Sequence, residues 1–136
     1  MNIVLDTNCL IMSLSRRSPY YSVWRNFVDG NYRLCITNDI LAEYEEILTQ
    51  KVGPEIASNV ITAILDLPNT RMVQVYYHLR LITADPDDDK FVDCAFKANA
   101  RYIVTQDHHY DVLKQTSFPF IDVIDIDEFV KVLKGR

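Results

Sequence analysis

The sequence is poor in residues that mark several classes of protein. It has three glycines and five prolines in 136 residues, too few for a fibrous or disordered chain. Its three cysteines, Cys9, Cys35 and Cys94, are widely spaced and form no CxxC pair. We therefore expect buried thiols in a reducing cytoplasm rather than disulfides or a zinc site. A glycine-rich phosphate loop is also missing, which argues against binding of a nucleoside triphosphate.

Long apolar runs and an excess of basic charge are missing as well. The longest uncharged stretch covers residues 56–65, far short of the roughly 18 residues that a membrane-spanning helix needs. Asp6 interrupts the N-terminus and no basic segment precedes it, so we expect no signal peptide and a cytoplasmic protein. The net charge of −5 argues at first against a nucleic-acid binder, whose usual signature is a basic patch. The length fits one domain, residues 1–136.

Apolar segments of strand length alternate with segments of helical period along the chain. This alternation predicts an α/β fold, a three-layer α/β/α sandwich around a parallel sheet. Strands are predicted at residues 3–5, 32–36, 72–77, 101–105 and 120–124. Helices are predicted at 20–28, from Thr37 or Asn38 to Lys51, from Gly53-Pro54 to Pro68, from the acidic stretch 85–89 to Asn99, after Asp107, and after Asp125, which forms a capping box with Glu128.

Two aspartates lie just beyond the ends of predicted strands. Asp6 comes after Ile3-Val4-Leu5, and Asp107 lies two residues beyond the apolar end of the strand at 101–105. Parallel strands place their carboxyl ends on the same rim of a sheet, so the two side chains are expected close together. The alternative for each is an ordinary loop or helix-capping aspartate.

Glu43 lies on the apolar side of its predicted helix. Ile40 and Ile47 are three residues before and four after it, so the three side chains share one face. Burying a carboxylate in an apolar stripe costs several kcal/mol unless it is paired or binds a metal. The alternative is a glutamate at the edge of the stripe that reaches water or pairs with an arginine.

The segment Asp85-Pro86-Asp87-Asp88-Asp89 holds four aspartates in five residues. Helix capping and the helix dipole explain one or two of them, and the mutual repulsion of the rest favours a nearby cation. We favour Asp89 as the side chain that faces the site, with Asp88 as the alternative. Together with Asp6, Glu43 and Asp107, these residues form a carboxylate set typical of Mg²⁺ or Mn²⁺. Such ions commonly act in phosphate-ester hydrolysis.

The pattern resembles the PIN-domain ribonucleases. The resemblance is carried by Ile3-Val4-Leu5-Asp6-Thr7-Asn8, by Thr37-Asn38 followed by Glu43, by residues 88–92 (DDKFV), and by Val104-Thr105-Gln106-Asp107. The order and spacing of these motifs hold from residue 2 to about residue 125. Among these proteins the sequence is most similar to the small single-domain, VapC-like toxins of toxin–antitoxin pairs.

This resemblance implies a sheet ordered 3-2-1-4-5 and RNA cleavage that depends on Mg²⁺ or Mn²⁺. It implies that Asp6, Glu43, Asp89 and Asp107 are the catalytic, metal-binding carboxylates, with Asp88 as a further candidate ligand. Asn8 and Thr105 match supporting positions, where they would orient a ligand, a carboxylate or a water. The implied partners are an RNA substrate, an antitoxin protein and a second copy of the chain.

Two other functions compete with this hypothesis. His108 and His109 follow Asp107 directly and could act as acid and base in metal-independent RNA cleavage, but that reaction gives Glu43 no role. The second is a non-catalytic PIN-fold module that binds RNA or protein. The motifs assign no residue to RNA contact. Five acidic residues are placed at the metal site, as many as the net charge of −5, so the acidity no longer argues against an RNA substrate.

Overall fold

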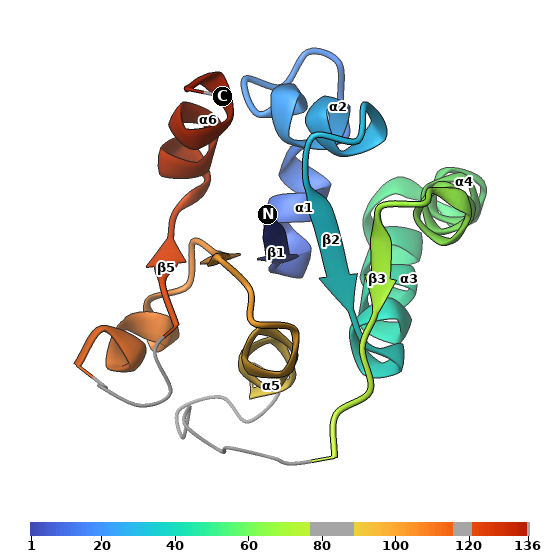
Figure 1. Ribbon diagram of the computed structural model, residues 1–136. Helices are drawn as coiled ribbons and strands as arrows, with labels where there is room; N and C mark the ends of the chain where they lie inside the picture. Colours follow the sequence, from blue (N-terminus) through green and yellow to red (C-terminus); the bar gives the residue numbers. More distant parts are fainter. Residues whose placement is uncertain (77–88, 116–120, 136) are drawn as a thin grey trace.

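The computed structural model describes residues 1–76, 89–115 and 121–135, without the side chains of residues 109, 112, 114 and 115. Its strands form a parallel sheet in the order β3-β2-β1-β4-β5 (Figure 1). The strands are β1 (Asn2–Leu5), β2 (Arg33–Ile36), β3 (Thr70–Met72), β4 (Tyr102–Val104) and β5 (Val123–Ile124). The predicted α/β class and the implied strand order are confirmed.

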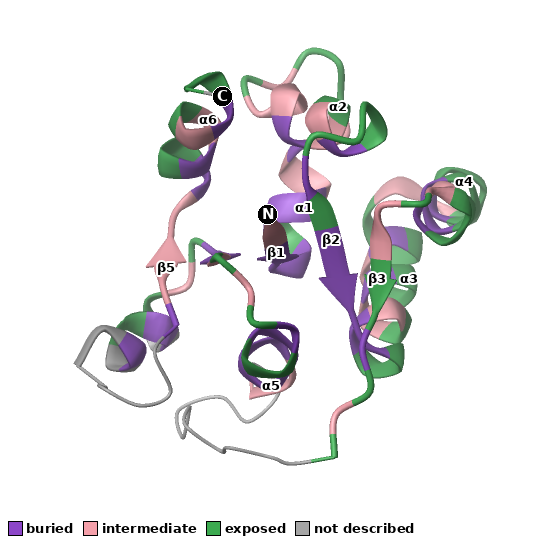
Figure 2. Cartoon of the chain, viewed as in Figure 1, coloured by how far each residue is buried: buried purple, intermediate pink, exposed green. Residues whose placement is uncertain are grey.

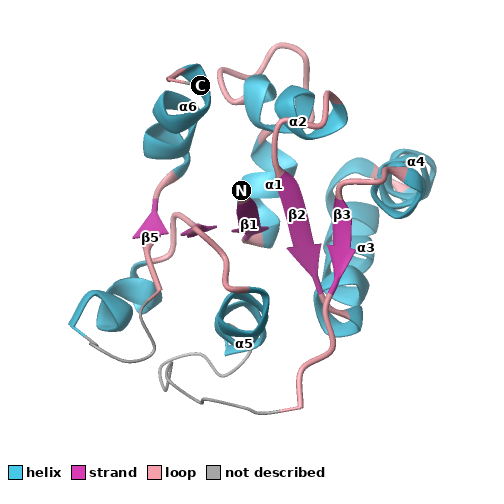
Figure 3. Ribbon diagram, in the orientation of Figure 1, coloured by secondary structure: helices cyan, strands magenta, loops and turns pink. Residues whose placement is uncertain are grey.

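Helices connect these strands, as Figure 3 shows. They are α1 (Thr7–Met12), α2 (Tyr21–Val28), α3 (Asn38–Val52), α4 (Pro54–Asp66), α5 (Asp89–Ala98), the 3₁₀ helix η2 (His108–Gln115) and α6 (Ile126–Lys134). Gly53 separates α3 from α4 with a φ of +88°, a conformation that glycine adopts without strain. The predicted capping box of Asp125 and Glu128 is present at the start of α6.

The third strand differs from its prediction. It covers Thr70–Met72 rather than residues 72–77, of which residue 77 lies outside the described part. The reason is the length of its neighbour. Strand β2 ends at Ile36 because Thr37 turns the chain into α3 and caps that helix. The last bond between the two segments runs from the N–H of Val73 to the carbonyl of Ile36, at 2.8 Å.

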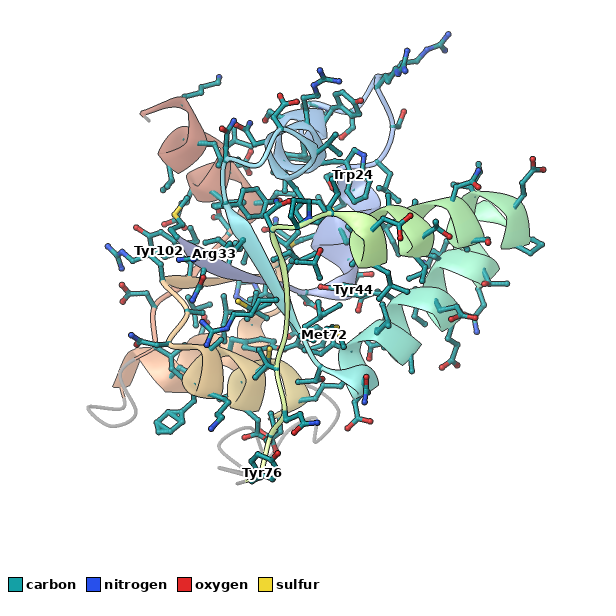
Figure 4. All side chains as sticks on the ribbon, turned by 45° about the vertical axis from the view of Figure 1, so that its right-hand side comes forward. Trp24, Arg33, Tyr44, Met72, Tyr76 and Tyr102 are labelled. Carbon is teal, nitrogen blue, oxygen red and sulfur yellow. The ribbon has the colours of Figure 1, made fainter. Side chains whose placement is uncertain are left out.

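The sheet lies between two layers of helices. Helix α5 packs against β1, β2 and β4, while α3 packs against α4 and α1. Figure 4 shows α5 and the pair α3–α4 on opposite sides of β2. Residues buried between the layers form the core, and the parts of the ribbon that carry them are purple in Figure 2. None of the described helices is long and apolar enough to cross a membrane.

The three cysteines belong to this core. Cys9, Cys35 and Cys94 are free and buried, which confirms the prediction of buried thiols. Burial raises the pKa of the Cys9 and Cys94 thiols to about 12. Both therefore stay protonated and unreactive at neutral pH.

Candidate functional site at the carboxyl ends of β1 and β4

The register of the central strands brings Asp6 and Thr105 together. Leu5 of β1 pairs with Val104 of β4, so the next residue of each strand emerges at the same edge of the sheet. The Thr105 hydroxyl donates to Asp6 Oδ2 at 2.7 Å and accepts from the N–H of Asp107 at 3.0 Å. Thr105 thus connects the two aspartates that the sequence predicted to lie at neighbouring strand ends.

Asp6 is a buried carboxylate held on two sides. It caps helix α1, where its Oδ1 accepts from the N–H of Thr7 at 2.7 Å. Burial raises the pKa of Asp6 above 3.8, and the nearby carboxylates of Glu43 and Asp107 raise it further, against the lowering effect of the two hydrogen bonds. A cation beside this carboxylate would reverse the shift, because an opposite charge favours the ionised form.

Glu43 reaches the same region from helix α3. The next residue, Tyr44, is buried, and its hydroxyl donates to the carbonyl of Leu5 at 2.5 Å. Figure 4 shows Tyr44 on α3. This bond fixes the second turn of α3 against the end of β1, immediately before Asp6. The anchor therefore places Glu43 close enough to Asp6 for their charges to interact.

Glu43 is paired rather than isolated among apolar side chains. Its Oε1 lies 2.7 Å from the Lys90 ammonium of α5, and its Oε2 accepts a hydrogen bond from the Thr7 hydroxyl. The Glu43 side chain is 25% exposed and that of Lys90 is 21% exposed. Of the two alternatives for this glutamate, the structure shows the paired side chain at the edge of the stripe, with a lysine as the partner.

Helix α5 contributes two carboxylates on one face. Asp89 is the first residue of the helix and is partly buried, and Asp93, one turn later, is 4% exposed. Both line the same cleft as Glu43. The predicted alternative Asp88 lies outside the described residues.

The cleft has a volume of about 1070 Å³. It lies between α3, the segment 73–76 that follows β3, and α5. Tyr76, at its edge, is 79% exposed, and Figure 4 shows it beyond the end of β3. The described residues that line the cleft are Thr37, Asn38, Asp39, Ala42, Glu43, Glu46, Val73, Gln74, Val75, Tyr76, Asp89, Lys90 and Asp93.

The remaining predicted residues lie in more exposed positions. Asn8 is exposed in the first turn of α1. Asp107 is partly buried in the loop between β4 and η2. The His108 side chain is 94% exposed and lies 3.5 Å from Asp111, while the His109 side chain is outside the described part.

Sequence reasoning gave no role to Lys90, Asp93 or Tyr44. Asp93 carried a usable signal, because it lies four residues after Asp89 and therefore on the same face of the helix. In the sequence Tyr44 lies four residues after Ile40, on the apolar side of the helix, and its hydroxyl bond to β1 has no signature in a single sequence. Lys90 belongs to the motif at residues 88–92, but nothing in the sequence brings α5 to α3.

The chemistry of the donors fits a hard divalent cation. Asp6, Glu43, Asp89 and Asp107 offer carboxylate oxygens, the ligands that Mg²⁺ and Mn²⁺ prefer. Among the described residues, however, no three histidine, cysteine, aspartate or glutamate side chains converge closely enough to hold a metal ion. Glu43 instead shares its oxygens with Lys90 and Thr7. A cation would compete with these partners and would remove the repulsion that raises the pKa of Asp6.

Comparison with known proteins gives a match to one family model and matches to several solved structures. A family model described as PIN domain matches residues 2–109. No curated protein matches the sequence significantly.

The second finding concerns solved structures. Chains in the structures of VapBC2 from Rickettsia felis and of VapBC from Salmonella typhimurium, both bound to DNA, superpose with a TM-score of 0.63. The identities are 17% and 18%, over 92% and 93% of this chain and 98% of each of those chains. A chain of VapBC-1 from nontypeable Haemophilus influenzae gives a TM-score of 0.62 at 15% identity, over 93% of this chain and 99% of that one.

Proposed function

The chain belongs to the PIN-domain family, and we propose on that basis that it is an endoribonuclease that hydrolyses RNA phosphodiester bonds with Mg²⁺ or Mn²⁺. The observation that carries the proposal is the hydrogen-bonded arrangement of carboxylates at the carboxyl ends of β1 and β4, where Thr105 joins Asp6 to the backbone of Asp107 and Thr7, which follows Asp6, donates to Glu43. There the buried Asp6 interacts with the charges of both Glu43 and Asp107. Carboxylates that lie close together repel one another, and this repulsion disfavours their ionised forms unless a cation offsets it.

In this proposal Asp6, Glu43, Asp89 and Asp107 hold the cation, with Asp88 as a further candidate ligand. The cation would supply positive charge at the phosphate and lower the pKa of the attacking water. Other residues of the chain hold these carboxylates in position. Thr105 holds Asp6 and the backbone of Asp107 in fixed relation, and Tyr44 fixes the helix that carries Glu43.

The cleft gives this site a place for substrate. It leads from Glu43 and Asp89 to Tyr76 at its edge, and an exposed tyrosine offers a face on which an unpaired base can stack. RNA that is extended and single-stranded would fit such a groove better than an A-form duplex, whose bases are not accessible in this way.

The biological role that we infer is that of the toxin of a toxin–antitoxin pair in the cytoplasm. The folds of the VapBC structures support this role, as does the resemblance of the motifs. The partners in this proposal are a cognate antitoxin and a second copy of the chain. A short gene for a DNA-binding antitoxin immediately upstream would support the role, and copurification of its product with this protein would test it.

Cleavage of a labelled single-stranded RNA tests the activity. We expect cleavage with Mg²⁺ or Mn²⁺, none with EDTA, and products with 5′-phosphate and 3′-hydroxyl ends, because water rather than the 2′-hydroxyl attacks. Asp6→Asn and Glu43→Gln should each lower the rate by about 10³-fold or more.

Glu45→Gln is the matched control, since Glu45 is exposed on the same helix, and should retain full activity. Activity that survives both EDTA and Asp6→Asn contradicts the proposal. Products with 2′,3′-cyclic phosphate and a loss of activity in His109→Ala would instead favour the histidine-based reaction. RNA binding without metal affinity and without cleavage would favour a non-catalytic module.

A further inference from the structure

Lys90 has an unusual position for a basic residue of this protein. Its ammonium group lies 2.7 Å from Glu43 Oε1, and each of the two side chains is at least three-quarters shielded from water. The pair joins α5 to α3 across the cleft. Because the second oxygen of Glu43 accepts from the Thr7 hydroxyl, both oxygens of this carboxylate already have a partner.

The surroundings of this lysine are strongly acidic. The described residues that line the cleft include five carboxylates, of Asp39, Glu43, Glu46, Asp89 and Asp93. The only ammonium or guanidinium group among these lining residues is that of Lys90. Lys90 is therefore the lining residue that partly neutralises the acidic cleft. Its partner there is Glu43, which a cation would need as a ligand.

We propose that Lys90 occupies the place of a cation on Glu43 and moves from this carboxylate to a phosphate of the RNA when the cation binds. The proposal rests on the proposed function, since it assumes that Glu43 is a metal ligand. It assigns Lys90 as a substrate-binding residue that also competes with the metal.

The position of Lys90 suits such an exchange. It lies in the first turn of α5, next to Asp89, so its backbone stays at the wall of the cleft whichever partner its ammonium contacts. The long flexible stem allows the ammonium to move without a change in the helix. The partial exposure of the pair lets water and ions reach it. Once the cation takes its place on Glu43, the released ammonium would lie at the wall of the cleft, within reach of a phosphate of RNA bound there.

Two binding measurements on the full chain test this exchange. In the first, Mn²⁺ is titrated into RNA-free protein by calorimetry. Lys90→Gln should bind Mn²⁺ about fivefold more tightly than the wild type, as expected for the loss of a partly shielded competing ion pair.

In the second measurement, a fluorescein-labelled single-stranded RNA is mixed with the Mn²⁺-saturated protein, and its anisotropy is followed before cleavage occurs. Lys90→Gln should bind this RNA about tenfold more weakly, because a charged hydrogen bond to phosphate is lost. One substitution is thus expected to move the two affinities in opposite directions.

Two further variants separate this role from a general charge effect. Lys51→Gln removes the same charge from an exposed position in the last turn of α3, away from the residues that line the cleft, and both affinities should change less than twofold. Lys90→Arg keeps the charge and should bind Mn²⁺ no more tightly than the wild type. Circular dichroism melts confirm that each variant is folded.

The possible results have distinct meanings. An unchanged or weaker Mn²⁺ affinity in Lys90→Gln overturns the competition, and an unchanged RNA affinity overturns the phosphate contact. Equal effects of Lys51→Gln also overturn the proposal, because they point to net charge alone. If the wild type binds no Mn²⁺ at all, the proposed function fails together with this inference.

Discussion

The two halves of the candidate site are built differently. The half at the ends of β1 and β4 is buried, and Asp6 has fixed hydrogen bonds from Thr105 and from the N–H of Thr7. The half on α3 and α5 borders the cleft, and its best-defined contact is the partly exposed ion pair of Glu43 with Lys90. The first half is determined by strand register, whereas the second depends on side chains that can change partners.

This difference separates two tasks of a metal-dependent site. A buried, hydrogen-bonded carboxylate holds one ligand in place before the cation arrives, as preorganisation requires. A carboxylate paired with a lysine can exchange that partner for a cation or substrate. Substitutions in the buried half should therefore affect stability and activity together, while substitutions at the cleft should mainly affect binding.

The largest difference in kcat/KM is expected between two variants in which a threonine is replaced by the isosteric valine. Thr105→Val removes the bond that orients Asp6 and the acceptor for the N–H of Asp107. It should lower kcat/KM for RNA cleavage by about 10- to 100-fold. Thr7→Val removes only the hydroxyl bond to Glu43, which keeps its pair with Lys90, and should cost less. A greater loss of kcat/KM in Thr7→Val would reverse the comparison.

A smaller effect is expected at the anchor that joins the two halves. Tyr44→Phe deletes the hydroxyl that donates to the carbonyl of Leu5 and leaves a buried acceptor without this donor. It should lower the free energy of unfolding by about 1–3 kcal/mol in urea titrations.

Tyr102→Phe is the control for this anchor. Its ring face lies 4.4 Å from the Arg101 guanidinium, a contact that does not need the hydroxyl. The expected change is below about 0.5 kcal/mol. Similar losses in the two variants would argue against Tyr44 as a specific anchor.

The smallest effect concerns the charge of Asp6 without metal. The pKa of Asp6 is raised above 3.8 in the folded protein. Between pH 3.8 and this raised pKa, the folded protein keeps the proton on Asp6 while the unfolded chain has released it. Stability should therefore fall as the pH rises past the ordinary value of 3.8 and stay low above the pKa of the folded state.

Asp6→Asn removes this titration. In EDTA at neutral pH its Tm should exceed that of the wild type by a few degrees, since about 1 kcal/mol corresponds to roughly 4 °C in a chain of this size. This difference in Tm between the variant and the wild type should vanish in acid, where Asp6 is protonated in both the folded and the unfolded chain. It should reverse in Mg²⁺, which would bind the wild-type carboxylate. A wild type that melts higher in EDTA at neutral pH would contradict the cause given for the raised pKa.

The sequence predicted the buried half of the site better than the cleft half. A short apolar run followed by an aspartate marks a buried strand end, and parallel pairing then brings Asp6 and Asp107 to one edge. Strand lengths were less predictable, because β3 ends where β2 turns into α3. Lys90 and Tyr44 act through contacts between elements far apart in the chain, and no local pattern encodes such contacts.

The measurement that tests the central claim most directly is a calorimetric titration of Mn²⁺ into RNA-free protein, comparing the wild type, Asp6→Asn and the control Glu45→Gln. The metal-site proposal predicts saturable binding in the wild type and in Glu45→Gln, and an affinity at least about tenfold weaker in Asp6→Asn. Equal Mn²⁺ affinity in all three proteins, or no binding by the wild type, would contradict it.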